Sequence, residues 1–181
     1  METLRRCASI ITWTFVGIVL GAAYGVVNDQ LSVTASPEYY SVFKHQQFLP
    51  LLTAFGADAA PLRLQAVVVG VCATWWFGML LGLAIGIVAN AGTRPPAPRG
   101  VITKAIVNVL LCVAVSSAVA GAVGYVIAPA INLTPSDWPF LDGIVDKRRA
   151  FAVGAWHDGA YLGGLIAAIA ASIAVWRKRT A

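Results

Sequence analysis

Seven polar side chains, gathered in two parts of this sequence, have the types that could do chemistry. They are Asn28, Asp29, Gln30, Glu38, His157, Asp158 and Tyr161. Carboxylates and an imidazole held at one level could ligate a metal ion or pass a proton. Their spacing matches no known metal motif, and no Gly-x-Ser-x-Gly, P-loop or Cys-x-x-Cys sequence occurs. The sequence therefore assigns no catalytic residue, metal or other cofactor, and it leaves these seven as a candidate polar site.

Long runs without charge separate these polar groups. No Asp, Glu, Lys, Arg or His occurs in residues 7–28, 64–93 or 105–136, and the run 150–176 contains only His157 and Asp158. A helix of about 20 apolar residues crosses the roughly 30 Å of a bilayer's hydrocarbon. Each run is long enough to cross once. The sequence predicts one all-α transmembrane domain over residues 1–181, a bundle of four helices at about 8–28, 65–90, 105–128 and 151–176.

The composition excludes most other classes of protein. Of 181 residues, 59% are hydrophobic and only 12% are charged, and the mean hydropathy is +0.76. An ordinary soluble domain is about 25% charged, so a soluble enzyme, a disordered chain and a fibrous protein are all poor interpretations. The positive charges form short clusters beside the apolar runs, where they would contact lipid headgroups. We therefore expect a lipid bilayer as the surroundings and no nucleic-acid partner.

The distribution of Lys and Arg predicts that both termini are cytoplasmic. The two terminal segments and the connection between the second and third spans hold eight Lys and Arg and one carboxylate. The outer loops, 29–64 and 129–150, together with the adjoining ends of the spans, hold five Lys and Arg and seven carboxylates. Basic residues are enriched on the cytoplasmic side, although the basic cluster at 147–149 opposes this orientation. The two outer loops are expected to form a small cap, too short to be a separate domain.

Helix geometry places the two polar groups at similar depth. At 1.5 Å per residue, Asp29 lies about 34 Å from Arg6, and Asp158 lies about 27 Å from Trp176. One interpretation is a polar pocket at the outer mouth of the bundle. The other, which is the commoner case, is structural: Asp29 is solvated at a helix end, His157 and Asp158 tether loop backbone, and the aromatic residues form an interfacial belt.

Glycines at intervals of four residues predict tight helix packing in the first two spans. Such spacing places them on one helix face, where two backbones can approach closely. The six glycines are Gly17, Gly21, Gly25, Gly78, Gly82 and Gly86. One such face could also remain free for a homo-oligomer.

Three short strings carry a resemblance to a known group of proteins. They are Tyr-Gly-Val-Val-Asn-Asp-Gln at 24–30, Glu-Tyr-Tyr at 38–40 and Ala-Thr-Trp-Trp-Phe-Gly at 73–78. With His157 and Tyr161 near the start of the fourth span, the chain resembles a group of small bacterial four-helix membrane proteins of uncharacterised function. Those proteins often have His where this chain has Asn28, which removes one potential ligand. The resemblance implies the architecture and a shared outer site, and it implies no reaction.

Three hypotheses for function follow. The first is a non-catalytic structural, accessory or assembly subunit of the bacterial cytoplasmic membrane, acting alone, as a homo-oligomer or with other membrane subunits. The second is a membrane enzyme or a metal- or proton-handling protein, which requires Asp29 and His157 to approach each other. The third, a small channel or transporter, ranks last because the centres of the spans have few polar residues.

Overall fold

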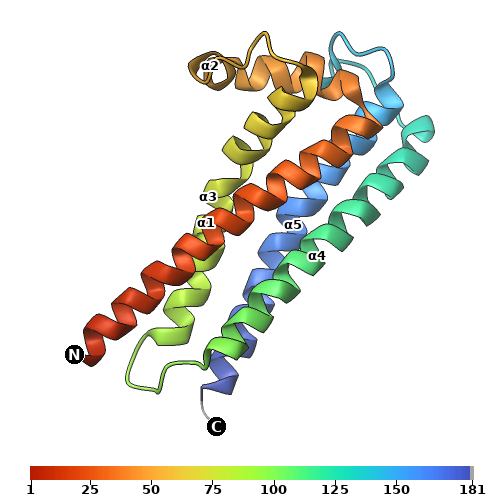
Figure 1. Cartoon of the computed structure of the whole chain (residues 1–181). Coiled ribbons are helices and arrows are strands. Elements are labelled where there is room, and N and C mark those ends of the chain that lie inside the picture. Colours follow the sequence, from red (N-terminus) through yellow and green to blue (C-terminus); the bar gives the residue numbers. More distant parts are fainter. Residues whose placement is uncertain (180–181) are drawn as a thin grey trace.

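Four long helices form the body of the protein in the computed structural model, which describes residues 1–179 (Figure 1). They are α1 (Glu2–Ala35), α3 (Leu62–Asn90), α4 (Arg99–Ile127) and α5 (Lys147–Lys178). All four are long and apolar enough to cross a membrane, and no strand occurs in the described residues. These helices confirm the prediction of an all-helical, multi-pass membrane protein. They are longer than the predicted spans because most of the helices extend beyond their apolar residues into the neighbouring charged segments.

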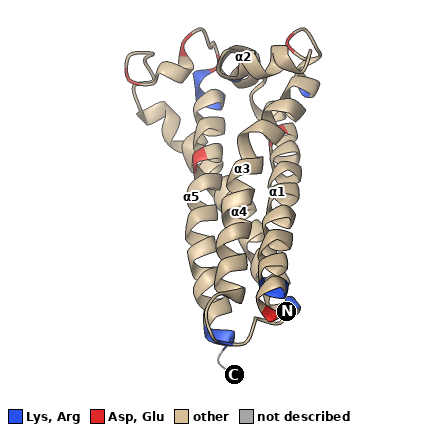
Figure 2. Ribbon diagram, turned by 90° about the vertical axis from the view of Figure 1, so that its left-hand side faces the viewer, with Lys and Arg blue, Asp and Glu red and all other residues tan. Residues whose placement is uncertain are grey.

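The helices associate as two pairs. Helix α1 packs along α3 and α4 packs along α5, while contact between the pairs is mainly between α3 and α5. The members of each pair are successive long helices of the chain, so each pair is a helical hairpin. Figure 2 shows most charged residues gathered at the two ends of the molecule, with the apolar length of the helices between them.

Glycines bring the backbones of α1 and α3 together. A Cβ atom added at Gly21 would lie 2.9 Å from the Cα of Gly78, and one added at Gly82 would lie 3.1 Å from the Cα of Gly17. The hydroxyl of Thr74 donates to the Gly21 carbonyl oxygen at 2.8 Å, across the contact. The glycine faces of the two helices are thus buried against each other within one chain. A homo-oligomer would have to use other faces.

Small residues also form the contact between α4 and α5. A Cβ atom at Gly124 would lie 2.8 Å from the Cβ of Ala155, and one at Gly159 would lie 2.7 Å from the carbonyl oxygen of Ser116. The glycines at this contact lie on both helices, as they do in the other pair. Each hairpin is therefore held by close backbone approach, which fixes the rotation of its two helices relative to each other.

Short helices connect the long ones at the end opposite the two termini (Figure 1). They are η1 (Tyr39–Lys44), α2 (His45–Ala54), η2 (Ala128–Ala130) and η3 (Pro139–Leu141). The segment 29–64, predicted as a loop, is mostly helical, and some of its apolar side chains are buried in a shared cluster. Tyr40 and Leu52 are at most 2% exposed, and they belong to a cluster that includes Leu141 and Val153. This cluster joins both connections to α5.

Two arginines close the end that carries the termini. The Arg179 guanidinium, 3% exposed, donates to four carbonyl oxygens at the end of α3 and in the connection that follows. These carbonyls belong to Val88, Ala91, Arg94 and Pro95. Arg6 donates to the carbonyl oxygen of Asn90 at 3.0 Å. Cations at the C-terminal end of a helix satisfy carbonyls that lack partners within the helix.

Candidate functional site

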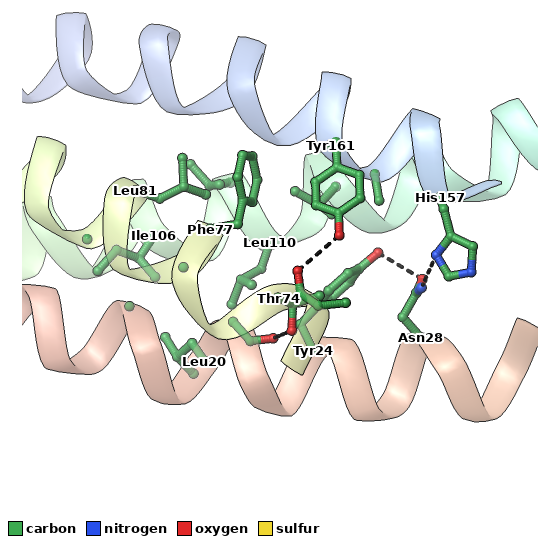
Figure 3. Close-up of a pocket in the computed structure, with 18 of the residues that line it drawn as sticks. Leu20, Tyr24, Asn28, Thr74, Phe77, Leu81, Ile106, Leu110, His157 and Tyr161 are labelled. Atoms are coloured by element: carbon green, nitrogen blue, oxygen red, sulfur yellow. Dashed lines mark hydrogen bonds between the residues drawn. The ribbon is translucent and has the colours of Figure 1, made fainter. Parts of the chain in front are cut away.

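Asn28 is the centre of a buried polar network between α1 and α5. Its Oδ1 accepts hydrogen bonds from the Trp156 indole at 2.7 Å and from the Tyr24 hydroxyl at 3.2 Å. Its amide nitrogen lies 3.3 Å from Asp29 Oδ1 and 3.4 Å from His157 Nδ1. Asn28 is 6% exposed, so an unsatisfied amide here would be costly, and four neighbours satisfy it. The two polar groups of the sequence therefore meet through Asn28, as part of this network shows in Figure 3.

The contacts of His157 define its protonation. The amide nitrogen of Asn28 can only donate, so Nδ1 of His157 accepts and the proton lies on Nε2. Nε2 lies 3.2 Å from the Tyr40 hydroxyl, which is 2.6 Å from Ser32 Oγ. The Ser32 hydroxyl donates in turn to the Asn28 carbonyl oxygen at 2.9 Å. The Tyr39 ring stacks on the imidazole, with centroids 5.6 Å apart. A neutral imidazole is thus held on three sides.

Tyr40 is fixed as a hydrogen-bond donor in this network. Burial, with a contribution from the negative charge of Asp29, raises the pKa of the Tyr40 hydroxyl well above its ordinary value. The phenol therefore stays protonated at neutral pH, since loss of its proton would leave a buried phenolate beside a carboxylate. Its proton goes to Ser32 Oγ, and its oxygen accepts from His157.

Asp29 differs from its neighbours because one of its oxygens has no partner. The residue is 3% exposed, and Oδ1 accepts from Asn28. Oδ2 is buried and has no hydrogen-bond donor among the described residues. A buried polar atom left in this state costs about 1–3 kcal/mol. The structure therefore presents an acceptor that a donor group from another molecule could satisfy.

Lys44 is the cation that acts on Asp29. Burial lowers the pKa of the Lys44 ammonium, while the charges of Asp29 and Asp158 act in the opposite direction. Its Nζ donates to Gln47 Oε1 at 2.9 Å. In the described part of the chain, Lys44 and Asp29 form no ion pair at contact distance. Lys44 and Asp29 therefore interact through their charges without direct contact.

A cavity of about 80 Å³ lies between the two hairpins and ends at this network. Its walls come from all four long helices and from η1. Six polar residues line one end: Tyr24, Asn28, Asp29, Lys44, His157 and Tyr161. The rest of the wall is mainly apolar, and Figure 3 labels part of it: Leu20, Phe77, Leu81, Ile106 and Leu110. The cavity thus has a polar, charged end and a mainly apolar remainder within the bundle.

Four of the seven predicted residues line this cavity, and three do not. Asn28, Asp29 and His157 lie at its polar end, and the Tyr161 hydroxyl donates to the Ala73 carbonyl oxygen at 3.0 Å. The three that lie elsewhere are Gln30, Glu38 and Asp158.

Each of those three has different surroundings. The Gln30 amide donates to the Arg63 carbonyl oxygen at 2.9 Å, at the start of α3. Glu38 Oε2 accepts from two backbone N–H groups, at 2.8 and 3.0 Å, just before α5 begins. Asp158 is exposed on α5. Gln30 and Glu38 thus hold separate segments together through backbone hydrogen bonds. The structural interpretation of the sequence expected this role for His157 and Asp158.

Sequence reasoning missed several members of the network. Tyr24 and Ser32 lie four residues before and after Asn28, so they share its helix face, and this spacing was a usable signal. Trp156 lies next to His157, but the aromatic residues were interpreted as an interfacial belt. Tyr40 and Lys44 come from a segment predicted as a loop, where spacing carries no information on direction.

No metal centre is formed by the residues that the structure describes. Among residues 1–179, no three side chains of His, Cys, Asp or Glu come together in an arrangement that could hold an ion. Asp29 and His157, which the metal hypothesis brings together, are each bonded to Asn28, and the described residues show no hydrogen bond between the two.

The fold and the site together define a multi-pass helical membrane protein with a buried polar cavity. Comparison with protein-family models, with curated proteins and with solved structures finds no match for this chain. The geometry of the cavity is therefore the basis for assigning a function.

Proposed function

We propose that this chain is a non-catalytic membrane protein that binds a short-chain primary amine in the cavity between its two hairpins. The observation that carries the proposal is Asp29 Oδ2, the one buried side-chain polar atom of the described residues that has no partner. It belongs to a residue that lines the polar end of the cavity. An ammonium group would supply the missing donor.

The unpartnered carboxylate oxygen favours a charged donor over a neutral one. Lys44, the cation on the cavity wall, forms no ion pair with Asp29 at contact distance among the described residues. A carboxylate can only accept hydrogen bonds, and charge-assisted hydrogen bonds are roughly twice as strong as neutral ones. The aromatic rings of Tyr24 and Tyr161 on the cavity wall would also favour a cation.

The rest of the ligand is limited by the shape of the cavity. Beyond the polar end, the walls are aliphatic and aromatic side chains from α1, α3 and α4. The volume of about 80 Å³ is roughly half that of an engineered protein cavity that binds benzene, about 150 Å³. A primary amine with one or two carbons fits both limits.

Binding without chemistry is favoured over the metal- or proton-handling alternative. The polar groups around Asn28 are bonded to one another, and Asn28 separates Asp29 from His157. This arrangement fixes the groups in place and leaves one acceptor free. The proposal keeps the accessory role expected from the sequence, in the bacterial cytoplasmic membrane with both termini in the cytoplasm. The support for that location is the excess of Lys and Arg on the side of the termini.

The test uses the full chain in nanodiscs and ethylammonium as the probe, with ethanol and acetate as comparators. Thermal unfolding and tryptophan fluorescence report binding, because Trp156 is bonded to Asn28 beside the cavity. We expect ethylammonium to bind most tightly. Loss of one charged hydrogen bond, worth about 1.5–3 kcal/mol, predicts that Asp29→Asn weakens binding by roughly 10- to 150-fold.

The matched control is Asp142→Asn, which removes a carboxylate from an exposed position in the η3 connection. We expect this variant to bind ethylammonium as the wild type does. Equal binding of ethylammonium and ethanol by the wild type would refute the proposal. So would unchanged binding in a folded Asp29→Asn variant.

A further inference from the structure

A second hollow lies between α4 and α5, toward the end that carries the termini, and the residues of α4 that line it differ from those that line the first. Its volume is about 540 Å³. It exists because the residues of α5 that face it are small, so the two helices leave space between them. The small residues on its walls are Ala105, Ala167, Ala170, Ala171 and Ala174. The surrounding walls are mainly apolar, and the hollow forms a groove on the part of the helices that crosses the membrane.

Two lysines, Lys104 and Lys178, line the groove from opposite helices. Both are exposed, and neither has a hydrogen bond or an ion pair among the described residues. Asn108, one turn after Lys104 on the same face of α4, also lines the groove. Among the described residues, no carboxylate does. The groove therefore has two unmatched positive charges and an amide at its polar end.

These features match the chemistry of one kind of molecule, an anionic phospholipid. Lysine binds phosphate as a point charge, and basic pockets between membrane helices bind anionic headgroups. The alanines beyond the lysines leave room for an acyl chain, which is apolar as the walls are. A soluble anion would use the two charges but would leave the apolar length of the groove empty.

We propose that this groove binds an anionic phospholipid from the leaflet that borders the two termini. The phosphate lies between Lys104 and Lys178, with Asn108 as a further hydrogen-bond donor, and one acyl chain lies along the alanines of α5. This site is separate from the cavity at Asp29, and it does not depend on the amine proposal. Each lysine adds electrostatic attraction to the headgroup. Together they predict a preference of roughly 30-fold for an anionic over a zwitterionic phospholipid.

The test is native mass spectrometry of the delipidated full chain. Dioleoyl-phosphatidylglycerol and dioleoyl-phosphatidylcholine are added in equal amounts, and the dissociation constant of the first bound lipid is measured for each. We expect phosphatidylglycerol to bind roughly 30-fold more tightly. The double variant Lys104→Gln/Lys178→Gln should lose this preference and keep weak binding of both lipids.

Two further variants separate the headgroup from the acyl chain. The control Arg5→Gln/Arg99→Gln removes the same charge from exposed positions at the same end of the molecule, outside the groove, and it should keep the preference. Ala170→Leu fills the groove at a lipid-facing position and should weaken binding of both lipids.

Three outcomes would overturn the proposal. They are a preference that survives in Lys104→Gln/Lys178→Gln, an equal loss in the arginine control, and displacement of the lipid by millimolar inorganic phosphate. The first two would show that net charge alone attracts the lipid, and the third would show a site for a free anion. Asp29→Asn should leave lipid binding unchanged, so this result and the amine result can be distinguished.

Discussion

Replacing Gly78 with alanine tests whether backbone approach holds α1 and α3 together. The added Cβ would lie 2.9 Å from the Cα of Gly21 and 3.0 Å from the carbonyl carbon of Gly17. Carbon atoms in favourable contact are about 3.5–4.0 Å apart, so the helices must separate by roughly 0.5–1 Å. Neither helix can yield locally, because the obstructing atoms are backbone. Overpacking of this kind costs about 1–3 kcal/mol, and we expect Gly78→Ala to lie near the upper limit.

The matched control for this experiment is Gly100→Ala. Gly100 lies in the first turn of α4, and a Cβ atom there would meet nothing within 4 Å. The control should be neutral or gain up to about 1 kcal/mol from helix propensity. Unfolding in mixed micelles by increasing SDS, followed by far-UV circular dichroism, measures both variants. If Gly78→Ala is as stable as Gly100→Ala, the close contact is not what stabilises the first hairpin, and the reasoning fails.

Two further predictions concern the ends of the bundle. Arg179→Ala removes the hydrogen bonds to four carbonyl oxygens. We expect the free energy of unfolding to fall by about 2 kcal/mol and hydrogen exchange to become faster in residues 91–98. Arg179→Lys should restore only part of both, because an ammonium lacks the guanidinium fork. Unchanged exchange there would contradict this role. Glu38→Ala should speed exchange of the Val145 and Asp146 amides, whose bonds to Glu38 it removes, whereas Glu38→Gln keeps an acceptor and should retain most of the protection.

The helices could be predicted from the sequence because the bilayer imposes a simple rule of length and charge. The same rise per residue also placed Asn28 and His157 at one depth, and their side chains lie 3.4 Å apart. Depth depends only on position along a helix, so it needs no knowledge of packing. The glycine spacing likewise indicated which helix faces approach closely.

Rotation about the helix axes could not be predicted in the same way. Successive residues of a helix point about 100° apart, so the packing between hairpins decides that Asn28, rather than Asp29, bonds to both His157 and Trp156. Tyr40 reaches the network, and Lys44 reaches the cavity, from η1, a π-helical turn. Such turns depend on tertiary contacts more than on local sequence.

The arrangement of the helices as two successive hairpins has a consequence for how the protein is made. The first hairpin, residues 2–90, contains both members of its glycine contact, so it can close in the membrane while the second is still being synthesised. The second contains both α4 and α5 and can insert in the same way. Only the last step, docking of one hairpin on the other, creates the cavity, since its walls come from both. The cavity therefore exists only once the two hairpins have docked, and the proposed amine would bind only the fully assembled chain.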